Sequence, residues 1–211
     1  GDKGNSRYAG NDQTSITGET IPSLKLKWSI EMPGGTRARS QPMISNGILY
    51  VGAADGRFMA LEAKTGCLIW EYQARAEMRH AAFIDQNKNG SQIYFGDLMG
   101  HAYSLEAKTG KLIWTNKVDP HPNTTITASP VVYEDRVYFA VSALEVTSAA
   151  DPNYECCTFR GSLVAYNKTT GEKSFQTYTI DEPASLKGEN DLGTKLYGPS
   201  GAPLWASLAV D

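Results

Sequence analysis

The chain has 211 residues, of which 41% are apolar, and 20 basic against 23 acidic residues leave a net charge of −3. A chain of this length can bury a sizeable core, and because no apolar run approaches the length of a membrane span, it is expected to be soluble. The basic residues are scattered and form no stripe, so nucleic acid is not expected as a partner. The sequence begins at Gly1 without a charged and apolar leader. A secretion signal is therefore expected to have been removed or never to have been there.

A unit that recurs three times is the strongest signal in the chain. Each copy holds a short strand with apolar residues at alternate positions, a Lys-Thr-Gly or Thr-Thr-Gly turn, and a second strand that ends on a large aromatic residue. The turn glycines and final aromatic residues are Gly66 with Trp70, Gly110 with Trp114, and Gly171 with Phe175. A repeat of about 40 residues indicates a propeller or a solenoid, because one unit cannot bury its own apolar face. A further hairpin upstream of each copy makes four strands per unit, which favours an all-β propeller of four-stranded antiparallel blades.

In chain order, the predicted elements begin with a lone strand near residues 24–30, which could complete the last blade of a closed ring. Three whole blades follow, near residues 36–73, 79–118 and 126–180. The start of a fourth blade is predicted at 198–211. Trp28, Trp70 and Trp114 are interpreted as structural packing between blades.

The number of predicted blades is too small for a closed ring. An open ring would expose sheet edges and apolar faces, which is an aggregation hazard. We therefore expect first that the chain is a fragment of a longer protein, and otherwise that it is one chain of an assembly or a natural truncation. The remaining blades or a second chain are accordingly expected partners.

Six motifs, together with the repeat, resemble the quinoprotein alcohol dehydrogenases, and within that group the polyvinyl alcohol dehydrogenase-like proteins. The motifs lie at residues 5–7, 24–28, 65–67, 119–122, 154–161 and 198–205. The Cys-Cys-Thr-Phe-Arg-Gly string within 154–161 is far more specific than the repeat, which also occurs in non-catalytic scaffolds of the outer-membrane assembly type. The resemblance implies an eight-bladed propeller with PQQ-type repeats, about half of which is present here, and pyrroloquinoline quinone (PQQ) as its cofactor.

PQQ is a flat tricarboxylate, so it needs an aromatic face, hydrogen-bond donors and a cation beside its reacting carbonyl. The resemblance implies Trp205 as the floor under the ring, Thr127 as a hydrogen-bonding residue, and Ser142 and Ala143 on a short turn that lines the cofactor. It also implies that Glu145 binds calcium, whose preferred ligands are carboxylate oxygens. Without a cofactor, Trp205 is plain packing, Thr127 and Ser142 are ordinary strand residues, and Glu145 is a solvated loop acid.

Cys156 and Cys157 are adjacent and can form a disulfide only in a small strained ring, which persists only in an oxidising compartment. This pair favours a periplasmic or secreted protein. The resembled family uses a Cys-Cys ring as a lid over the quinone, but its pair lies at the start of the second blade, where this chain has residues 79–83. Two roles are therefore considered for the pair: a lid over the cofactor, and a loop staple, which is a disulfide that only holds its loop in place. Cys67 is expected to be a buried thiol.

Two arginines mark departures from the family. Where the family carries a cofactor-binding Glu just before a Thr-Pro pair of the first blade, this chain has Arg39 ahead of residues 40–42. Arg79 lies at a blade entrance that faces the expected centre. A guanidinium suits a carboxylate, so both residues are candidates for binding the cofactor. They could otherwise be surface charges, and Arg39 could also indicate a different ligand.

The resemblance implies the oxidation of a primary or secondary alcohol. Calcium makes the quinone carbonyl more electrophilic, an Asp base removes the alcohol proton, hydride passes to the quinone, and electrons leave singly to a cytochrome. The family places that base and a calcium-binding Asn after the Trp205 position, beyond Asp211, so the chain alone is expected to be inactive. No Cys-x-x-Cys-His haem motif occurs, so the acceptor is expected to be another domain or a cytochrome c. The alternative is a non-catalytic propeller that serves as a binding or assembly scaffold.

Overall fold

The computed structural model describes residues 10, 12, 14–32, 35, 37–87 and 90–210. The motif at residues 5–7 and residue Asp211 lie outside the described residues. Strands make up most of the regular structure, and the helices of the described part are the 3-10 helix η1 (Ile21–Ser23) and the short helix α1 (Glu145–Ser148). Neither helix is long and apolar enough to cross a membrane.

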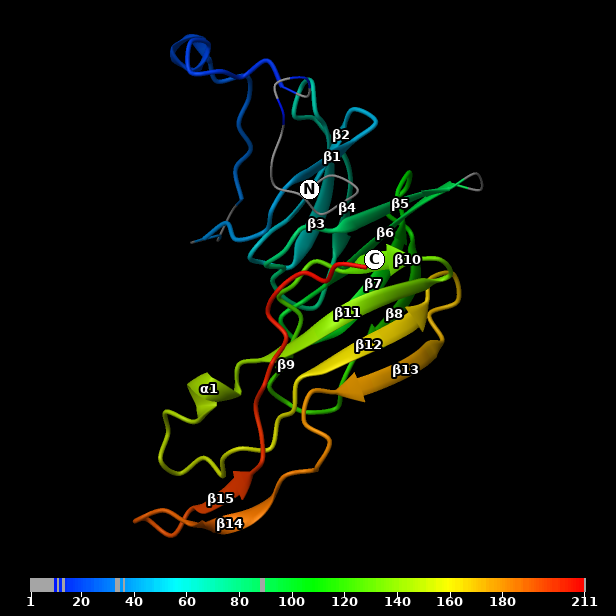
Figure 1. Cartoon of the computed structure of the whole chain (residues 1–211). Coiled ribbons are helices and arrows are strands. Elements are labelled where there is room, and N and C mark those ends of the chain that lie inside the picture. Colours follow the sequence, from blue (N-terminus) through cyan, green and yellow to red (C-terminus); the bar gives the residue numbers. More distant parts are fainter. Residues whose placement is uncertain are drawn as a thin grey trace.

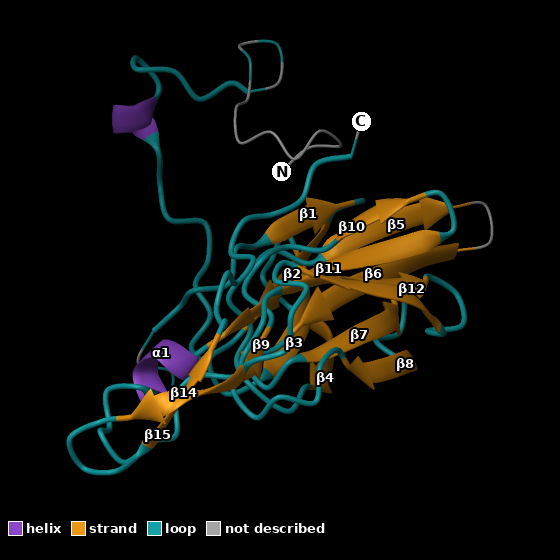
Figure 2. Cartoon of the chain, turned by 60° about the horizontal axis from the view of Figure 1, so that its bottom comes forward, coloured by secondary structure: helices purple, strands orange, loops and turns teal. Residues whose placement is uncertain are grey.

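Three antiparallel sheets follow one another along the chain (Figures 1 and 2). The first contains β1 (Met43–Ser45), β2 (Ile48–Gly52), β3 (Arg57–Glu62) and β4 (Leu68–Gln73). The second contains β5 (Phe83–Asn87), β6 (Gly90–Gly96), β7 (His101–Glu106) and β8 (Leu112–Lys117). The third contains β10 (Val131–Tyr133), β11 (Arg136–Ala143), β12 (Ser162–Asn167) and β13 (Lys173–Tyr178), and β9 (Thr124–Thr125) pairs with the end of β11. This arrangement confirms the predicted all-β class of four-stranded antiparallel blades.

Neighbouring sheets pack through the tryptophan that ends each repeat. A Cβ atom on Gly110 would lie 2.5 Å from the ring of Trp70, and Trp114 covers Gly171 in the same way. The indole Nε1 of Trp70 donates a hydrogen bond of 3.0 Å to the carbonyl oxygen of Ala107. Both glycines have a positive φ, so each makes the turn and also leaves room for the indole.

Aromatic residues fill the space between the sheets. Between the first and second sheets, Phe58 lies 4.5 Å from Phe95, and Phe95 stacks on Tyr103 at 4.8 Å between ring centroids. Between the second and third sheets, Trp114 packs with Tyr94 and Tyr166. These side chains are almost fully buried, so the period-two pattern of the sequence places its apolar face in contact with the next sheet.

Residues 24–30, predicted as a lone strand, form no strand in the structure. Figure 1 shows the preceding stretch, in blue, as a segment that carries η1 and stands away from the sheets. A strand needs a neighbour for its main-chain hydrogen bonds, and no strand of the described chain pairs with this segment. Trp28 nevertheless packs on Gly66 as Trp70 packs on Gly110, with its Nε1 donating to the carbonyl oxygen of Ala63 at 3.1 Å.

The region after the third sheet includes residues 198–211, where the start of a fourth blade is predicted. A hairpin of β14 (Ser185–Glu189) and β15 (Lys195–Gly198) comes first and extends away from the sheets (Figure 1). The described residues that follow form no strand, but Gly201 makes a parallel bridge with Arg160, and Leu204 donates its N–H to the carbonyl oxygen of Val141 at 3.1 Å. Residues 201–204 therefore attach to the third sheet, through a strand residue of β11 and through the link that precedes β12.

Candidate functional site

The loops that carry most of the predicted site residues meet at one end of the sheets. Because the strands are antiparallel, the links β2–β3, β6–β7 and β11–β12 lie at the same end as the links from one sheet to the next. Main-chain hydrogen bonds join these loops, from Leu98 N to the carbonyl oxygen of Glu77 and from Leu144 N to that of Asn123, each at 3.0 Å. Residues that are far apart in the sequence therefore share one surface.

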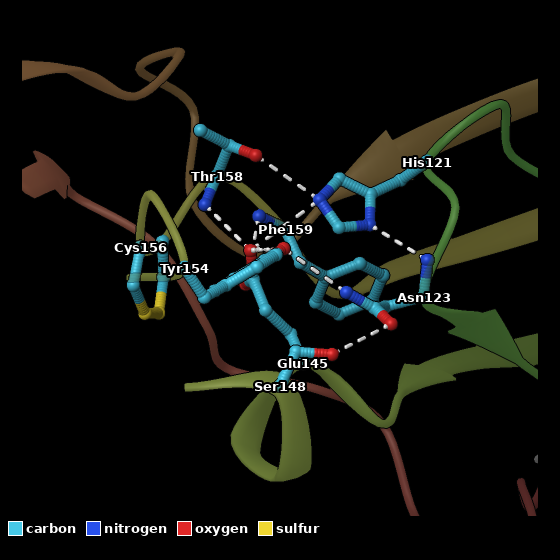
Figure 3. Close-up of a disulfide and its surroundings, with 9 residues drawn as sticks. His121, Asn123, Glu145, Ser148, Tyr154, Cys156, Thr158 and Phe159 are labelled. Atoms are coloured by element: carbon cyan, nitrogen blue, oxygen red, sulfur yellow. Dashed lines mark hydrogen bonds and ion pairs between the residues drawn. A yellow bond between two sulfur atoms is a disulfide. The ribbon is translucent and has the colours of Figure 1, made fainter. Parts of the chain in front are cut away.

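The best-defined cluster on this surface surrounds Glu145, the buried first residue of α1 (Figure 3). Its Oε1 accepts hydrogen bonds from the N–H of Thr158 at 2.9 Å and from the hydroxyl of Tyr154 at 3.1 Å. Its Oε2 accepts from the N–H of Phe159 at 3.0 Å, and His121 Nε2 lies 3.4 Å from Oε1. Protein donors, rather than water, thus satisfy this carboxylate.

The imidazole of His121 and the amide of Asn123 complete the cluster. Nδ1 of His121 accepts from the N–H of Asn123 at 3.2 Å, so in the neutral ring we assign the proton to Nε2, which lies 3.0 Å from Thr158 Oγ1. Asn123 donates to the hydroxyl of Tyr154 and accepts from that of Ser148. Burial and the Glu145 charge raise the pKa of Tyr154, so its hydroxyl stays protonated as a donor.

The structure contains the vicinal disulfide between Cys156 and Cys157, in the link between β11 and β12 beside the Glu145 cluster (Figure 3). Its backbone pairs with β15: Tyr197 N donates to the carbonyl oxygen of Cys156 at 2.6 Å, and Cys157 N donates to that of Tyr197 at 3.3 Å. Lys195 adds an exposed ion pair with Glu155 at 3.6 Å. These contacts are those of a staple between the loop and the hairpin; the lid role stays a prediction.

Unpaired buried hydroxyls gather where β9 meets the end of β11. Thr125 lies opposite Ser142 in the register, both are buried, and neither hydroxyl has a hydrogen-bond partner among the described residues. The hydroxyl of Thr127, two positions after Thr125, is also buried and unpaired, whereas Ala143 is buried without a polar group. An unpaired buried hydroxyl costs about 1–3 kcal/mol, so these groups suit a ligand rich in oxygen atoms. Thr125 was not among the predicted site residues, although it lies two positions before Thr127, on the same side of an extended chain.

Glu77 is a second buried carboxylate at this end of the sheets, and it forms ion pairs with two arginines. Glu77 binds Arg37 at 2.9 Å and Arg79 at 3.3 Å, and the Nε of Arg79 is buried without a partner in the described part of the chain. Burial alone would raise the pKa of Glu77, but the hydrogen bonds and charges of the two arginines hold it below its ordinary value. Arg39 is exposed and does not join this cluster. Arg37 and Glu77 were missed because nothing in their sequence spacing indicates that they meet.

Trp205 and Cys67 are exposed, unlike the buried residues described above. Trp205 is 58% exposed, so its indole presents a free face in the described chain. Cys67 is an exposed free thiol, and the expectation that it is buried was wrong. It directly precedes β4, the outer strand of the first sheet, where Leu68 is exposed as well.

The residues of the site fit PQQ better than they fit calcium. Unpaired hydroxyls, the free Nε of Arg79 and the exposed indole of Trp205 are the donors and the aromatic face that a planar tricarboxylate requires. A calcium site is a poorer fit, because three protein groups already surround Oε1 of Glu145. In addition, no group of three or more His, Cys, Asp or Glu residues is placed to hold a metal in the described ranges. Glu145 as a calcium ligand stays a prediction.

Comparison with known proteins supports the resemblance. The family model described as outer membrane protein assembly factor BamB matches residues 8–153 and 90–190. Polyvinylalcohol dehydrogenases from a Pseudomonas species and from a Sphingopyxis species are each 33% identical, over 98% and 90% of this chain and 32% and 30% of their own lengths. The chain therefore spans about a third of these curated relatives.

Solved structures agree on the fold. The quinohemoprotein alcohol dehydrogenase of Comamonas testosteroni superposes with a TM-score of 0.63 at 23% identity, covering 79% of this chain and 24% of that one. A europium-containing methanol dehydrogenase superposes with a TM-score of 0.59 at 23% identity, covering 78% and 28%. The chain thus belongs to the PQQ-repeat propeller family that the matching model represents, and its curated relatives include polyvinylalcohol and quinohemoprotein alcohol dehydrogenases.

Proposed function

We propose that this chain is the N-terminal portion of a PQQ-dependent alcohol dehydrogenase of the polyvinyl alcohol dehydrogenase type. The whole protein would oxidise primary or secondary alcohols and pass electrons to a cytochrome c. The observation that carries the proposal is the 33% identity to a polyvinylalcohol dehydrogenase across 98% of the chain. Activity is proposed for the whole protein and not for this chain alone, because the chain spans 32% of that relative.

The unpaired polar groups of the site support the cofactor assignment. PQQ, when bound, supplies a two-electron acceptor for the hydride of an alcohol. Thr127 and Ser142 would donate their hydroxyls to it, Arg79 would pair with one of its carboxylates, and Trp205 would stack on its ring. Arg39 stays a candidate for a second carboxylate. Ala143 would line the ring without a polar contact.

The proposal also includes a calcium ion at Glu145 and a lid formed by the disulfide. Calcium at Glu145 would have to share a carboxylate with its present donors and take its other ligands from outside the described residues. A lid role for Cys156 and Cys157 would bring the disulfide over the cofactor. The disulfide itself supports a periplasmic or secreted location, because such bonds persist in oxidising compartments.

The family model favours a second candidate function. Its description is that of an outer membrane assembly factor, so a propeller without a cofactor that binds other proteins is the alternative. The two candidates differ in one measurable property, which is specific binding of PQQ.

The test is a titration of the full-length protein with PQQ, with and without calcium, followed by tryptophan fluorescence. We expect saturable quenching, and a Kd about 5-fold weaker in Trp205→Phe, because a stacking contact is worth about 1 kcal/mol. Trp28→Phe is the matched control, since that indole packs on Gly66 away from the site. Absence of binding by the full-length protein would refute the cofactor assignment and leave the scaffold function.

A further inference from the structure

The link between β11 and β12 is far longer than the corresponding links of the other two sheets. Residues 53–56 connect β2 to β3 and residues 97–100 connect β6 to β7, whereas residues 144–161 connect β11 to β12. This long link, which we call the disulfide loop, has Glu145 near its start and carries Cys156 and Cys157 near its other end. Its two ends meet again in the structure (Figure 3).

The contact that closes the disulfide loop joins a charge to main-chain donors. The N–H groups of Thr158 and Phe159, at 2.9 and 3.0 Å, reach the two different oxygens of the Glu145 carboxylate. Both donors immediately follow the disulfide. Because the carboxylate is buried, hydrogen bonds to it are worth more than exposed ones, and its position depends on where these two N–H groups lie.

The backbone of the disulfide is held on the opposite side by β15. Tyr197 donates to Cys156 and accepts from Cys157 through main-chain hydrogen bonds of 2.6 and 3.3 Å. The segment 156–159 therefore lies between the hairpin and Glu145. The disulfide restricts the torsion angles of the two residues on which both sets of contacts depend, since it closes a covalent ring through their side chains.

We propose that the Cys156–Cys157 segment is a positioning element for the Glu145 carboxylate. With the disulfide closed, the N–H groups of Thr158 and Phe159 hold both carboxylate oxygens; with the disulfide open, the carboxylate moves. The inference concerns only residues of this chain and requires neither PQQ nor calcium. Its consequence, that the redox state of the loop sets how Glu145 faces the site, rests on the proposed function.

Opening the disulfide requires an external reductant, and a small dithiol supplies it. The S–S bond breaks, each sulfur gains one electron and one proton, and the dithiol loses two electrons and two protons as it closes its own disulfide. Cys67 is an exposed thiol that could exchange with the pair. A Cys67→Ser background therefore removes this side reaction.

The test measures two quantities by NMR, without PQQ, before and after reduction with dithiothreitol. They are the hydrogen-exchange rates of the Thr158 and Phe159 amides and the ¹³C resonance of Glu145 Cδ. We expect exchange to become at least about 10-fold faster and the Cδ resonance to move, because a lost hydrogen bond to a buried charge is worth more than 1.4 kcal/mol. The Gly171 amide, which donates to the carbonyl oxygen of Asn167 at 2.9 Å in the turn between β12 and β13, is the reference for opening outside the disulfide loop and should not change.

Two variants test the same contact with the disulfide closed. Glu145→Gln should accelerate the Thr158 and Phe159 amides, because an amide offers one acceptor oxygen in place of two. Glu155→Gln is the matched control in the same loop; it removes an exposed carboxylate that contacts Lys195 and Tyr197 but not Glu145, and should leave both amides unchanged.

Several results would overturn the proposal. They are unchanged exchange on reduction, faster exchange with an unmoved Glu145 resonance, or equal acceleration at Gly171, since each means that the disulfide does not position the carboxylate. PQQ binding is measured separately, so failure of this inference and failure of the proposed function are distinguishable.

Discussion

The second and third sheets each hold a buried carboxylate in the link between two strands. The two carboxylates find their hydrogen-bond donors at different distances along the sequence. Asp97, in the short β6–β7 link, is fully buried and accepts from the N–H groups of Met99 and His101 at 2.9 Å and from the hydroxyl of Tyr103 at 2.7 Å. Glu145, in the long β11–β12 link, likewise accepts from two N–H groups and one tyrosine hydroxyl. These two buried carboxylates are thus satisfied by main-chain N–H groups and a tyrosine hydroxyl, although their loops differ in length.

The difference lies in where the donors come from. The donors of Asp97 lie two, four and six residues away, so its contacts stabilise a turn. The donors of Glu145 lie nine, thirteen and fourteen residues away, so its contacts close an insertion that carries a disulfide. Loss of the first should affect the sheet as a whole, and loss of the second should affect mainly the loop.

The largest expected effect belongs to Asp97. In Asp97→Ala, two main-chain N–H groups and the buried hydroxyl of Tyr103 lose their acceptor, so the free energy of unfolding should fall by about 4 kcal/mol. Urea denaturation followed by circular dichroism measures this loss. A loss below about 1 kcal/mol would contradict the view that this carboxylate supports the second sheet.

Glu145→Ala should cost less, about 2 kcal/mol, because the disulfide loop can open and hydrate its donors without opening the third sheet. The expected pattern in hydrogen exchange by mass spectrometry is faster exchange confined to residues 144–161 and to the contacting hairpin. Faster exchange throughout β11 and β12 would instead show that the two carboxylates are equivalent.

The two tyrosines give a finer comparison. Tyr103 is almost fully buried and its hydroxyl lies 2.7 Å from Asp97, whereas Tyr154 is less buried and its hydroxyl lies 3.1 Å from Glu145. We expect Tyr103→Phe to cost about 1.5 kcal/mol and Tyr154→Phe about 0.7 kcal/mol. Thermal unfolding of both variants beside the wild type measures the order, and the reverse order would refute the comparison.

The smallest expected effect concerns Glu77, whose partners are side-chain cations. Its pKa is held below its ordinary value of 4.5, so the unfolded chain binds a proton first as the pH falls. The stabilisation is present above pH 4.5 and is lost as the pH drops through the lower pKa of the folded state. Because Arg37 is half exposed, we expect only about 0.5 kcal/mol.

The measurement for Glu77 is the stability of wild type and Glu77→Gln at several pH values below 6, about where carboxyl groups titrate. The difference between the two proteins should shrink as the pH falls. A difference that is constant with pH would show that the ion pairs with Arg37 and Arg79 contribute nothing through the charge of Glu77.

Most of the fold could be predicted because its signals are local. The alternating residues of a strand, the turn at Gly110 and the tryptophan at Trp114 all lie within one repeat, so the sequence predicts the four-stranded sheets and the packing between them. The lone strand at residues 24–30 was not confirmed, because a strand depends on a partner that its own residues do not specify.

The contacts of the candidate site could be found only in the tertiary structure. The sequence by itself determined that Cys156 and Cys157 are adjacent and close enough to bond, and that Glu145 precedes Cys156 by 11 residues. Only the folded chain decided that Thr158, Phe159 and His121 satisfy the Glu145 carboxylate, and that Cys67 is exposed. The physical reason is that strand and turn patterns follow from neighbouring residues, whereas the partners of a buried charge come from any loop that the fold brings to it.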